Sequence, residues 1–316
     1  MSANGELRVV RACELAERAP DEPRWLIEDL WSAGAVGVLG GAPKCGKTWL
    51  SLEMALAVAS GRPCLGRFAV PQAGPALVYA AEDAPVAVRD RLAGLARARG
   101  VEFARLDVHV ILAPSLRLDR PDDLARLRAT LEARRPRLLV LDPYVRLQRV
   151  DENNATEVSA ILAALRELSR VFALALVLVH HARKNPADGT GQALRGSSDF
   201  HAWGDSNLYV RRRGPDLVLS IEHRAAPSPP EPFVLGLVAE DDSPRLEVRA
   251  SPPHAESARP IEQRVIEALR DGNGPRRHDD LRAALKVRNQ TLLMTLRELE
   301  GRGKVIRLDG GWLWNG

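Results

Sequence analysis

The sequence has few cysteines and no long apolar run. Its 316 residues include three cysteines, at positions 13, 45 and 64. They are odd in number and lack CxxC spacing, so we expect a reducing compartment and no zinc site. The sequence has no run of about eighteen uncharged apolar residues, which is the length that a membrane-spanning helix needs. Charged residues interrupt the first thirty positions, which argues against a secretory signal. We therefore predict a cytoplasmic protein with no membrane partner.

Aromatic residues are also scarce, at 4%, and the charge is nearly balanced, with a net charge of +4. This excess is too small to indicate nucleic-acid binding by itself. Its distribution is more informative, because the segment from Arg259 to Gly316 holds twelve basic and eight acidic residues. That segment alone accounts for the excess of the whole chain. The length suits about two domains.

Apolar runs alternate with amphipathic stretches through the first two thirds of the chain. We expect strands over residues 35–40, 75–81, 107–112, 138–142 and 174–180, and helices over 46–59, 84–99, 121–134 and 154–170. Several of these strands are apolar throughout, which is typical of a parallel sheet covered by helices on both faces. Two further runs, 207–212 and 217–222, flank Gly214-Pro215 and predict a hairpin.

These elements predict an α/β domain over residues 35–240, after a lead segment, 1–34, with an apolar patch between Trp25 and Trp31. Residues 241–259 contain several prolines and few apolar positions, and we predict a linker there. Residues 260–316 predict three short helices, at 261–269, 281–285 and 289–301, and then a two-stranded hairpin around Asp309–Gly311. This order is typical of a winged-helix domain.

Residues 41–48 carry the strongest motif, GAPKCGKT, which fits GxxxxGK[ST] between a predicted strand and a predicted helix. Such a loop turns backbone N–H groups toward phosphate oxygens, and the helix N-terminus adds positive potential. Lys47 is expected to reach the β- and γ-phosphates of ATP, and Thr48 to bind Mg²⁺. The alternative is a glycine-rich turn in which the lysine has no role in binding phosphate. Cys45 is most simply a small residue of the loop, and its alternative role is a redox switch. The predicted nucleotide-binding positions are Gly41, Ala42, Pro43, Lys44, Cys45, Gly46, Lys47, Thr48 and Trp49.

Two carboxylates follow other predicted strands. Asp142 ends the apolar run 138–142 and, paired with the phosphate loop, is expected to hold Mg²⁺. Glu82 follows the strand after the phosphate-loop helix, and we predict that it is the general base that activates water. Asp83 beside it has the alternative role of capping the next helix.

His180 and His181 close the fifth apolar strand, where ligands gather in such sheets. Together the segments GAPKCGKT, YAAEDAP, RLLVLDPY, DENN and LVLVHHARK resemble the plasmid hexameric replicative helicases of the RepA type and their AAA-type, RecA-fold relatives, over residues 25–240. The resemblance implies a RecA-like P-loop NTPase core, a homo-oligomeric ring, and His181 as a γ-phosphate sensor with catalytic influence.

The resemblance also implies a cation supplied by the neighbouring subunit, which stabilises charge in the transition state. Arg224 matches its place, while Arg211, Arg212 and Arg213 are competitors and an ordinary surface arginine remains an alternative. The glycine-rich, basic loop 182–200 suits contact with single-stranded DNA, although a solvated loop would look the same.

The tail departs from the plasmid helicases, to which no winged helix is appended. Its third helix could read duplex DNA and its hairpin could follow phosphates, or the domain could bind a protein. The leading hypothesis is a Mg²⁺-dependent, ring-forming ATPase acting on DNA as a helicase-like or replication-associated motor. The alternative is a DNA-bound regulator whose slow ATP turnover switches assembly. A small-molecule kinase is disfavoured, because no arginine-rich lid is evident.

Overall fold

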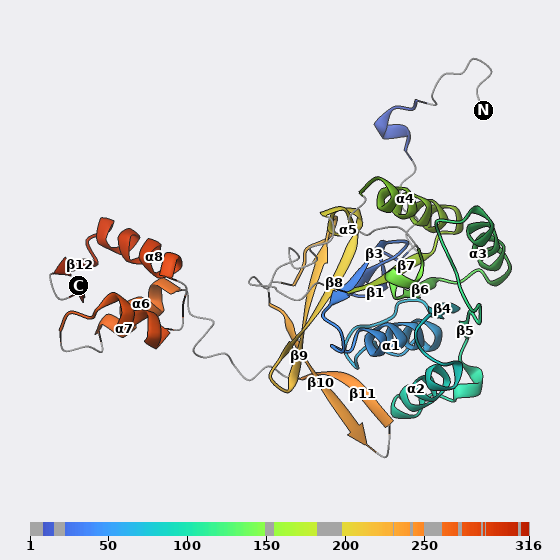
Figure 1. Cartoon of the computed structure of the whole chain (residues 1–316), viewed down its shortest axis with the longest axis horizontal. Coiled ribbons are helices and arrows are strands. Elements are labelled where there is room, and N and C mark those ends of the chain that lie inside the picture. The colour runs from blue at the N-terminus through green and yellow to red at the C-terminus, as the bar shows by residue number, and fades with distance from the viewer. Residues whose placement is uncertain are drawn as a thin grey trace. The chain divides into compact units, whose positions relative to one another are not determined.

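The chain divides into two units, Met1–Ala250 and Ser251–Gly316. A computed structural model describes residues 9–15, 23–148, 155–181, 198–229, 231–240, 243–249, 261–270, 274–285, 287, 289–308 and 311–315. Figure 1 shows the first unit as a large sheet with helices on both faces. Within the described residues, no helix combines the length and the apolarity needed to cross a membrane.

A nine-stranded sheet, in the order β11-β10-β9-β8-β3-β7-β6-β4-β5, organises the first unit. Its strands are β3 (Val36–Gly41), β4 (Ala76–Ala80), β5 (Val108–Val110), β6 (Leu138–Asp142), β7 (Ala175–His181), β8 (Ser206–Arg213), β9 (Asp216–His223), β10 (Phe233–Glu240) and β11 (Ser243–Arg249). The pairs from β8 through β3, β7, β6 and β4 to β5 are parallel. The pairs β8–β9, β9–β10 and β10–β11 are antiparallel. The sheet is therefore mainly parallel, as predicted, with an antiparallel extension.

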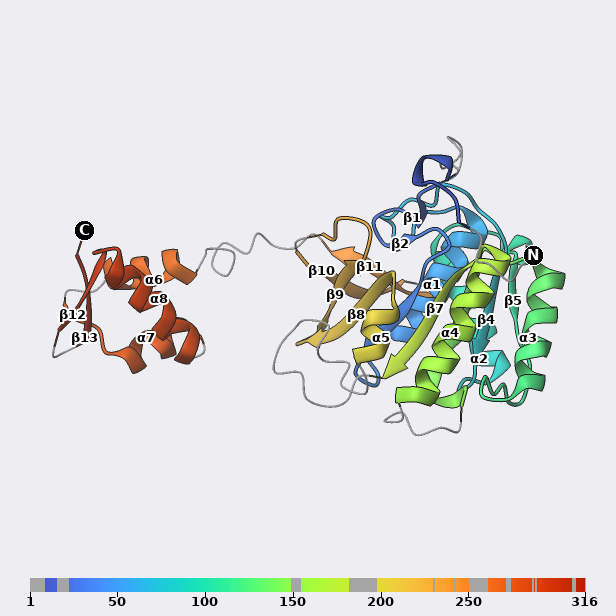
Figure 2. The same ribbon diagram turned by 90° about the horizontal axis from the view of Figure 1, so that it is seen from above.

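Helices cover the two faces of this sheet (Figure 2). They are α1 (Lys47–Ser60), α2 (Pro85–Ala98), α3 (Pro121–Arg134), α4 (Ala155–Phe172) and α5 (Ser198–Trp203). The unit also has three 3-10 turns, η1 (Ala12–Glu14), η2 (Phe103–Arg105) and η3 (Tyr144–Arg146), of which η1 has no buried residue. Alternate strand residues point to opposite faces. Val177 and Val179 of β7 therefore join α1 and α2 in one core, whereas Leu176 and Leu178 join α3, α4 and α5 in the other.

Helix α1 is enclosed on nearly all sides, since ten of its fourteen residues are buried. The sheet covers one side, and α2 and β11 pack against it from others. Glu53 of α1 is fully buried, and one of its oxygens accepts hydrogen bonds from the guanidinium of Arg99, the nearer at 2.6 Å, and from the Leu65 amide at 2.9 Å. Arg99 also donates to the Leu246 carbonyl of β11 at 3.0 Å. This buried ion pair links α1, the end of α2 and the sheet extension.

The predicted linker at 241–259 is wrong in its first part, because Ser243–Arg249 forms β11 and pairs with β10. Prolines favoured a linker, but Pro244 lies near the start of an edge strand, where the missing N–H is tolerated. The signal that was missed is the alternation of Leu246 and Val248 with charged residues. The lead segment also contributes to the first unit, since β1 (Trp25–Ile27) and β2 (Trp31–Ser32) pair and Trp31 lies in its core.

The second unit contains the three helices and two strands that its sequence predicts. They are α6 (Ile261–Arg270), α7 (His278–Leu285), α8 (Asn289–Gly301), β12 (Val305–Leu308) and β13 (Gly311–Trp314). Leu292, Leu296 and Leu299 of α8 are buried together with Trp312 of the hairpin. Trp312 therefore packs the core of this unit, as expected for an aromatic residue in such a hairpin.

We expect Arg99→Met to lower the free energy of unfolding by about 3–5 kcal/mol, because it leaves the Glu53 carboxylate buried without its partner. Replacing both residues by Met should restore most of this loss. Arg105→Met is the matched control: its exposed ion pair with Glu102 contributes less than about 1 kcal/mol. Urea unfolding followed by tryptophan fluorescence measures all three, and equal effects at the two sites would contradict the role of the buried pair.

Candidate functional site

A cavity of about 460 Å³ opens where several strands of the sheet end. The phosphate loop follows β3, Glu82 follows β4, Asp142 ends β6 and His181 ends β7. Because these strands run parallel and lie close together in the sheet, their carboxyl ends meet at one edge. Eight of the residues predicted as site residues line the cavity, namely Lys44, Gly46, Lys47, Thr48, Trp49, Glu82, Asp142 and His181.

The loop 41–46 needs glycine at two positions. A side chain on Gly41 would begin 2.3 Å from the Val210 carbonyl oxygen of β8, so only glycine fits between β3 and β8. Gly46 has φ of +83°, a left-handed conformation that glycine adopts without strain, and α1 begins at the next residue. Lys44 also has a positive φ, of 61°. The loop thus turns sharply into the buried helix.

Lys47 is the first residue of α1 and is 4% exposed. Its Nζ donates to the carbonyl oxygens of Gly41 at 3.0 Å and Ala42 at 2.8 Å. Burial lowers the pKa of Lys47 from its ordinary value. The ammonium group is therefore held inside its own loop, where it can exchange these carbonyls for an anion.

Asp142 faces the start of α1 from the end of β6. Burial raises its pKa to about 6, while a hydrogen bond with Thr48 and the charge of Lys47 oppose that rise. Its Oδ2 is buried and has no hydrogen-bond partner among the described residues. An unpartnered carboxylate oxygen beside a threonine hydroxyl fits a hydrated divalent cation. The described residues contain no cluster of three His, Cys, Asp or Glu that could hold a metal by itself, so phosphate oxygens or water would complete this site.

Two further carboxylates, Glu82 and Asp83, each lie against an arginine. The Glu82 Oε1 lies 2.8 Å from Nε of Arg146, and the Asp83 Oδ2 lies 2.6 Å from Nη1 of Arg91. Asp83 does not cap α2, because Ala84 is the N-cap residue. Neither arginine was predicted from the sequence as part of the site. Arg146 lies four residues after Asp142, but no pattern in the sequence connects it to Glu82.

The two histidines have different surroundings. His180 is buried, stacks on Phe200 with ring centroids 4.4 Å apart, and has its pKa lowered to about 4 by burial. It is therefore neutral at pH 7 and supports the core. His181 lines the cavity, and its buried Nδ1 has no hydrogen-bond partner among the described residues. Burial, followed by the charge of Lys47, lowers the pKa of His181.

An apolar wall closes the other side of the cavity. It is formed by Leu217 of β9, Leu237 of β10 and Leu246 of β11. Leu217 and Leu246 approach Gly46 so closely that a side chain there would begin 3.0 and 4.0 Å from them. Trp49 lies at the same cavity, with the guanidinium of Arg91 5.7 Å from its ring centre. Leu237 and Leu246 were not predicted as site residues because β10 and β11 were not predicted. Leu217 lies in the predicted strand 217–222, but nothing in the sequence placed that strand at the cavity.

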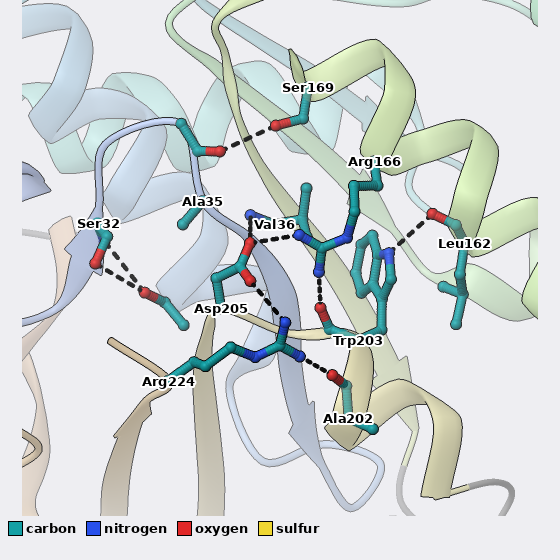
Figure 3. A network of polar contacts seen from close by, with 12 residues as sticks. Ser32, Ala35, Val36, Leu162, Arg166, Ser169, Ala202, Trp203, Asp205 and Arg224 are labelled. Carbon is teal, nitrogen blue, oxygen red and sulfur yellow. Dashed lines mark hydrogen bonds and ion pairs between the residues drawn. The ribbon is translucent and has the colours of Figure 1, made fainter. Parts of the chain in front are cut away.

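The structure does not bring Arg224 to this cavity. Arg224 follows β9, and the register Ser206↔His223 puts it beside the start of β8, at the edge of the sheet opposite the phosphate loop. Figure 3 shows Arg224 and Arg166 both directed at Asp205. Arg224 also donates to the Ala202 carbonyl. Arg212 lines the cavity of its own chain and donates to the Lys44 carbonyl at 3.3 Å.

Some predicted contact residues lie outside the described residues. They include the basic loop from Ala182 to Ser197, and Asp309 and Gly310 of the hairpin turn. The DENN segment of the family resemblance, at 151–154, also lies outside the described residues, and no contact was predicted for it. The structure describes the backbone of Asn289, Gln290 and Thr291 at the start of α8 but not their side chains. The predicted DNA contacts of these segments therefore stay predictions.

The raised pKa of Asp142 predicts that the free energy of unfolding depends on pH. The folded protein holds a proton on Asp142 up to about pH 6, whereas an unfolded aspartate releases it near pH 4. Stability of the ligand-free protein should therefore fall as pH rises between these values. Asp142→Asn should remove that dependence and stabilise the protein by about 2–3 kcal/mol at pH 7.

Denaturant unfolding from pH 4 to 8 measures this effect. Asp119→Asn, at an exposed position, is the matched control and should keep the wild-type profile. An Asp142→Asn protein that is less stable than the wild type at pH 7 would contradict the desolvation of this carboxylate.

Three comparisons with known proteins bear on this geometry. A search of curated proteins gives no match. In shape, the chain is similar to a DnaB-like replicative helicase (TM-score 0.51, 14% identity, 70% of this chain and 58% of that one). It also matches the RadB recombinase (TM-score 0.49, 15% identity, 69% and 92%). The likeness to the helicase supports the predicted RecA-like α/β fold. A family model described as an AAA domain matches residues 6–187. Because that match spans more than half of the sequence, the chain belongs to the AAA domain family.

Proposed function

We propose that this protein binds ATP with Mg²⁺, hydrolyses it, and acts on DNA. The observation that carries the proposal is the meeting of the phosphate loop, Asp142 and Glu82 around one cavity. Each comes from a different strand end, so their proximity depends on the strand order and not on local sequence. The match to the AAA domain family supports the same reading.

The phosphate loop would bind the triphosphate. Backbone N–H groups at the bend and at the start of α1 suit phosphate oxygens. Lys47 would exchange its contacts with the Gly41 and Ala42 carbonyls for the β- and γ-phosphates. The apolar wall of Leu217, Leu237 and Leu246, with Trp49, would cover the base and the sugar.

Thr48 and Asp142 would hold Mg²⁺, which neutralises developing charge on the phosphates. Glu82 would take a proton from a water molecule that attacks the γ-phosphorus while the bond to ADP breaks. His181, whose Nδ1 is unpartnered among the described residues, would sense the γ-phosphate.

Two observations support action on DNA. The chain resembles the fold of a protein described as a replicative helicase. The second unit has the element order of a winged helix and exposes Arg277, Arg297 and Arg307. We propose a ring in which single-stranded DNA contacts the first unit and duplex DNA the second. The alternative is a DNA-bound regulator that does not unwind.

Lys47→Ala should abolish ATP binding and hydrolysis, because it removes the buried cation of the loop. Glu82→Gln should keep ATP affinity within about threefold but lower kcat at least about 100-fold, as expected for loss of a general base. Equilibrium binding of a fluorescent ATP analogue and phosphate release separate the two effects. Arg89→Gln, on the exposed face of α2, is the control and should behave as wild type. Wild-type protein that neither binds nor cleaves ATP would disprove the proposal.

The two DNA hypotheses differ in what DNA does to turnover. A motor should hydrolyse ATP faster with single-stranded DNA and should separate a forked duplex. A regulator should bind DNA with turnover unchanged and separate nothing. Phosphate release and strand displacement, measured on the same preparation, distinguish these outcomes.

If Arg224 acts on a neighbouring subunit, mixing two inactive variants should restore activity. Arg224→Ala subunits keep Glu82, and Glu82→Gln subunits keep Arg224, so some interfaces of a mixed ring are complete. Phosphate release should then exceed that of either variant alone. Arg212→Ala mixed with Glu82→Gln is the control, because Arg212 lies at its own cavity and should not complement. No gain in the first mixture would exclude Arg224 as the shared cation.

A further inference from the structure

Arg146 contacts Glu82 from the neighbouring strand end. Its Nε donates to Oε1 of Glu82 at 2.8 Å. Glu82 follows β4 and Arg146 follows β6, and these two strands are paired in the register Ala80↔Asp142. The ion pair therefore joins the proposed general base to the strand that carries the proposed metal ligand.

The backbone of Arg146 is fixed by the turn η3. Tyr144 and Leu147 on either side are fully buried in the core between the sheet and α4. Arg117 donates to the Arg146 carbonyl at 2.8 Å and to the Gln148 carbonyl at 2.9 Å. The side chain of Arg146 remains 58% exposed and extends to Glu82. The buried turn therefore fixes the backbone from which the Arg146 side chain reaches Glu82.

The carboxylates at this end of the sheet have separate partners. Asp83 pairs with Arg91, Asp142 hydrogen-bonds Thr48, and Glu82 pairs with Arg146. Three carboxylates at one cavity repel each other when ionised. The guanidinium of Arg146 offsets this repulsion and keeps Glu82 at the cavity. An ion pair this exposed contributes little to the free energy of unfolding. Its contact engages Oε1 of Glu82 and not Oε2.

We propose that Arg146 is the positioning residue of Glu82. By engaging Oε1, it leaves Oε2 to accept the proton of the attacking water. Arg146 touches neither ATP nor water in this role and acts through Glu82 alone. The inference rests on the proposed function, because it assumes that Glu82 is the base.

A double-mutant cycle tests the inference. Arg146→Gln should lower kcat about 10- to 100-fold, a part of what loss of a general base costs, with KM for ATP changed less than about threefold. Arg146→Lys should recover part of the rate, since it keeps the charge. In a Glu82→Gln background, Arg146→Gln should have no further effect, because the residue it orients is already gone.

Several outcomes would overturn this role. The first is an Arg146→Gln variant with the kcat of the wild type. The second is an equal fold-loss of kcat when Arg146→Gln is made in the wild type and in Glu82→Gln, because this result indicates that Arg146 acts independently of Glu82. A rise in KM alone would make Arg146 a substrate-binding residue instead. Thermal unfolding of each variant, and Arg89→Gln as a control, exclude general damage. If the wild type hydrolyses ATP and Glu82→Gln lowers kcat, the proposed function stands. A double-mutant cycle without the expected coupling then contradicts only the role of Arg146.

Discussion

The burial of α1 is the constraint on which the rest of the structure depends. The helix begins directly after the left-handed Gly46 and is surrounded by the sheet, α2 and β11, so its first turn has little freedom to move. The position of Lys47 is therefore set by the packing of the nine other buried residues of α1. The Glu53–Arg99 pair adds a polar tie to that packing and joins α1 to two elements far away in sequence. The phosphate loop is rigid at its helical end because the core holds that end.

Strand order then decides which side chains meet α1. Because β7 lies between β3 and β6, and β6 lies beside β4, residues from four separate segments reach one edge of the sheet. The site combines groups in opposite environments. Asp142 and Lys47 are desolvated and shifted toward their neutral forms, whereas Glu82 and Asp83 are partly exposed and paired with arginines. A ligand that brings both phosphate and a cation would stabilise the charged forms of Lys47 and Asp142 together, because the phosphate attracts the ammonium group and the cation attracts the carboxylate.

Much of this arrangement could be predicted from the sequence, because the signals were local. Continuous apolar strands predicted the parallel sheet. One loop motif and the residues that end three strands predicted eight of the sixteen residues that line the cavity. The hairpin of β8 and β9 was predicted. The two outer strands of the antiparallel extension, β10 and β11, were missed, and in β11 prolines and charged residues hid the alternation of Leu246 and Val248. Long-range pairs such as Glu82–Arg146 and Glu53–Arg99 leave no periodic trace, because they depend on which strands become neighbours. The position of Arg224 depends on the strand register, which puts it at the end of β8 and β9 opposite the phosphate loop.

The extension also leaves β11 as one of the two terminal strands of the nine-stranded sheet. A terminal strand offers free backbone groups to any other extended chain, and this is a common route to aggregation. Here the Leu246 carbonyl already accepts a hydrogen bond from Arg99, and Arg245, Glu247 and Arg249 place charges along the strand. Desolvating these charges opposes the addition of a tenth strand. The contact of Arg99 with β11, which joins this terminal strand to α2, therefore also opposes the pairing of β11 with a strand of another molecule.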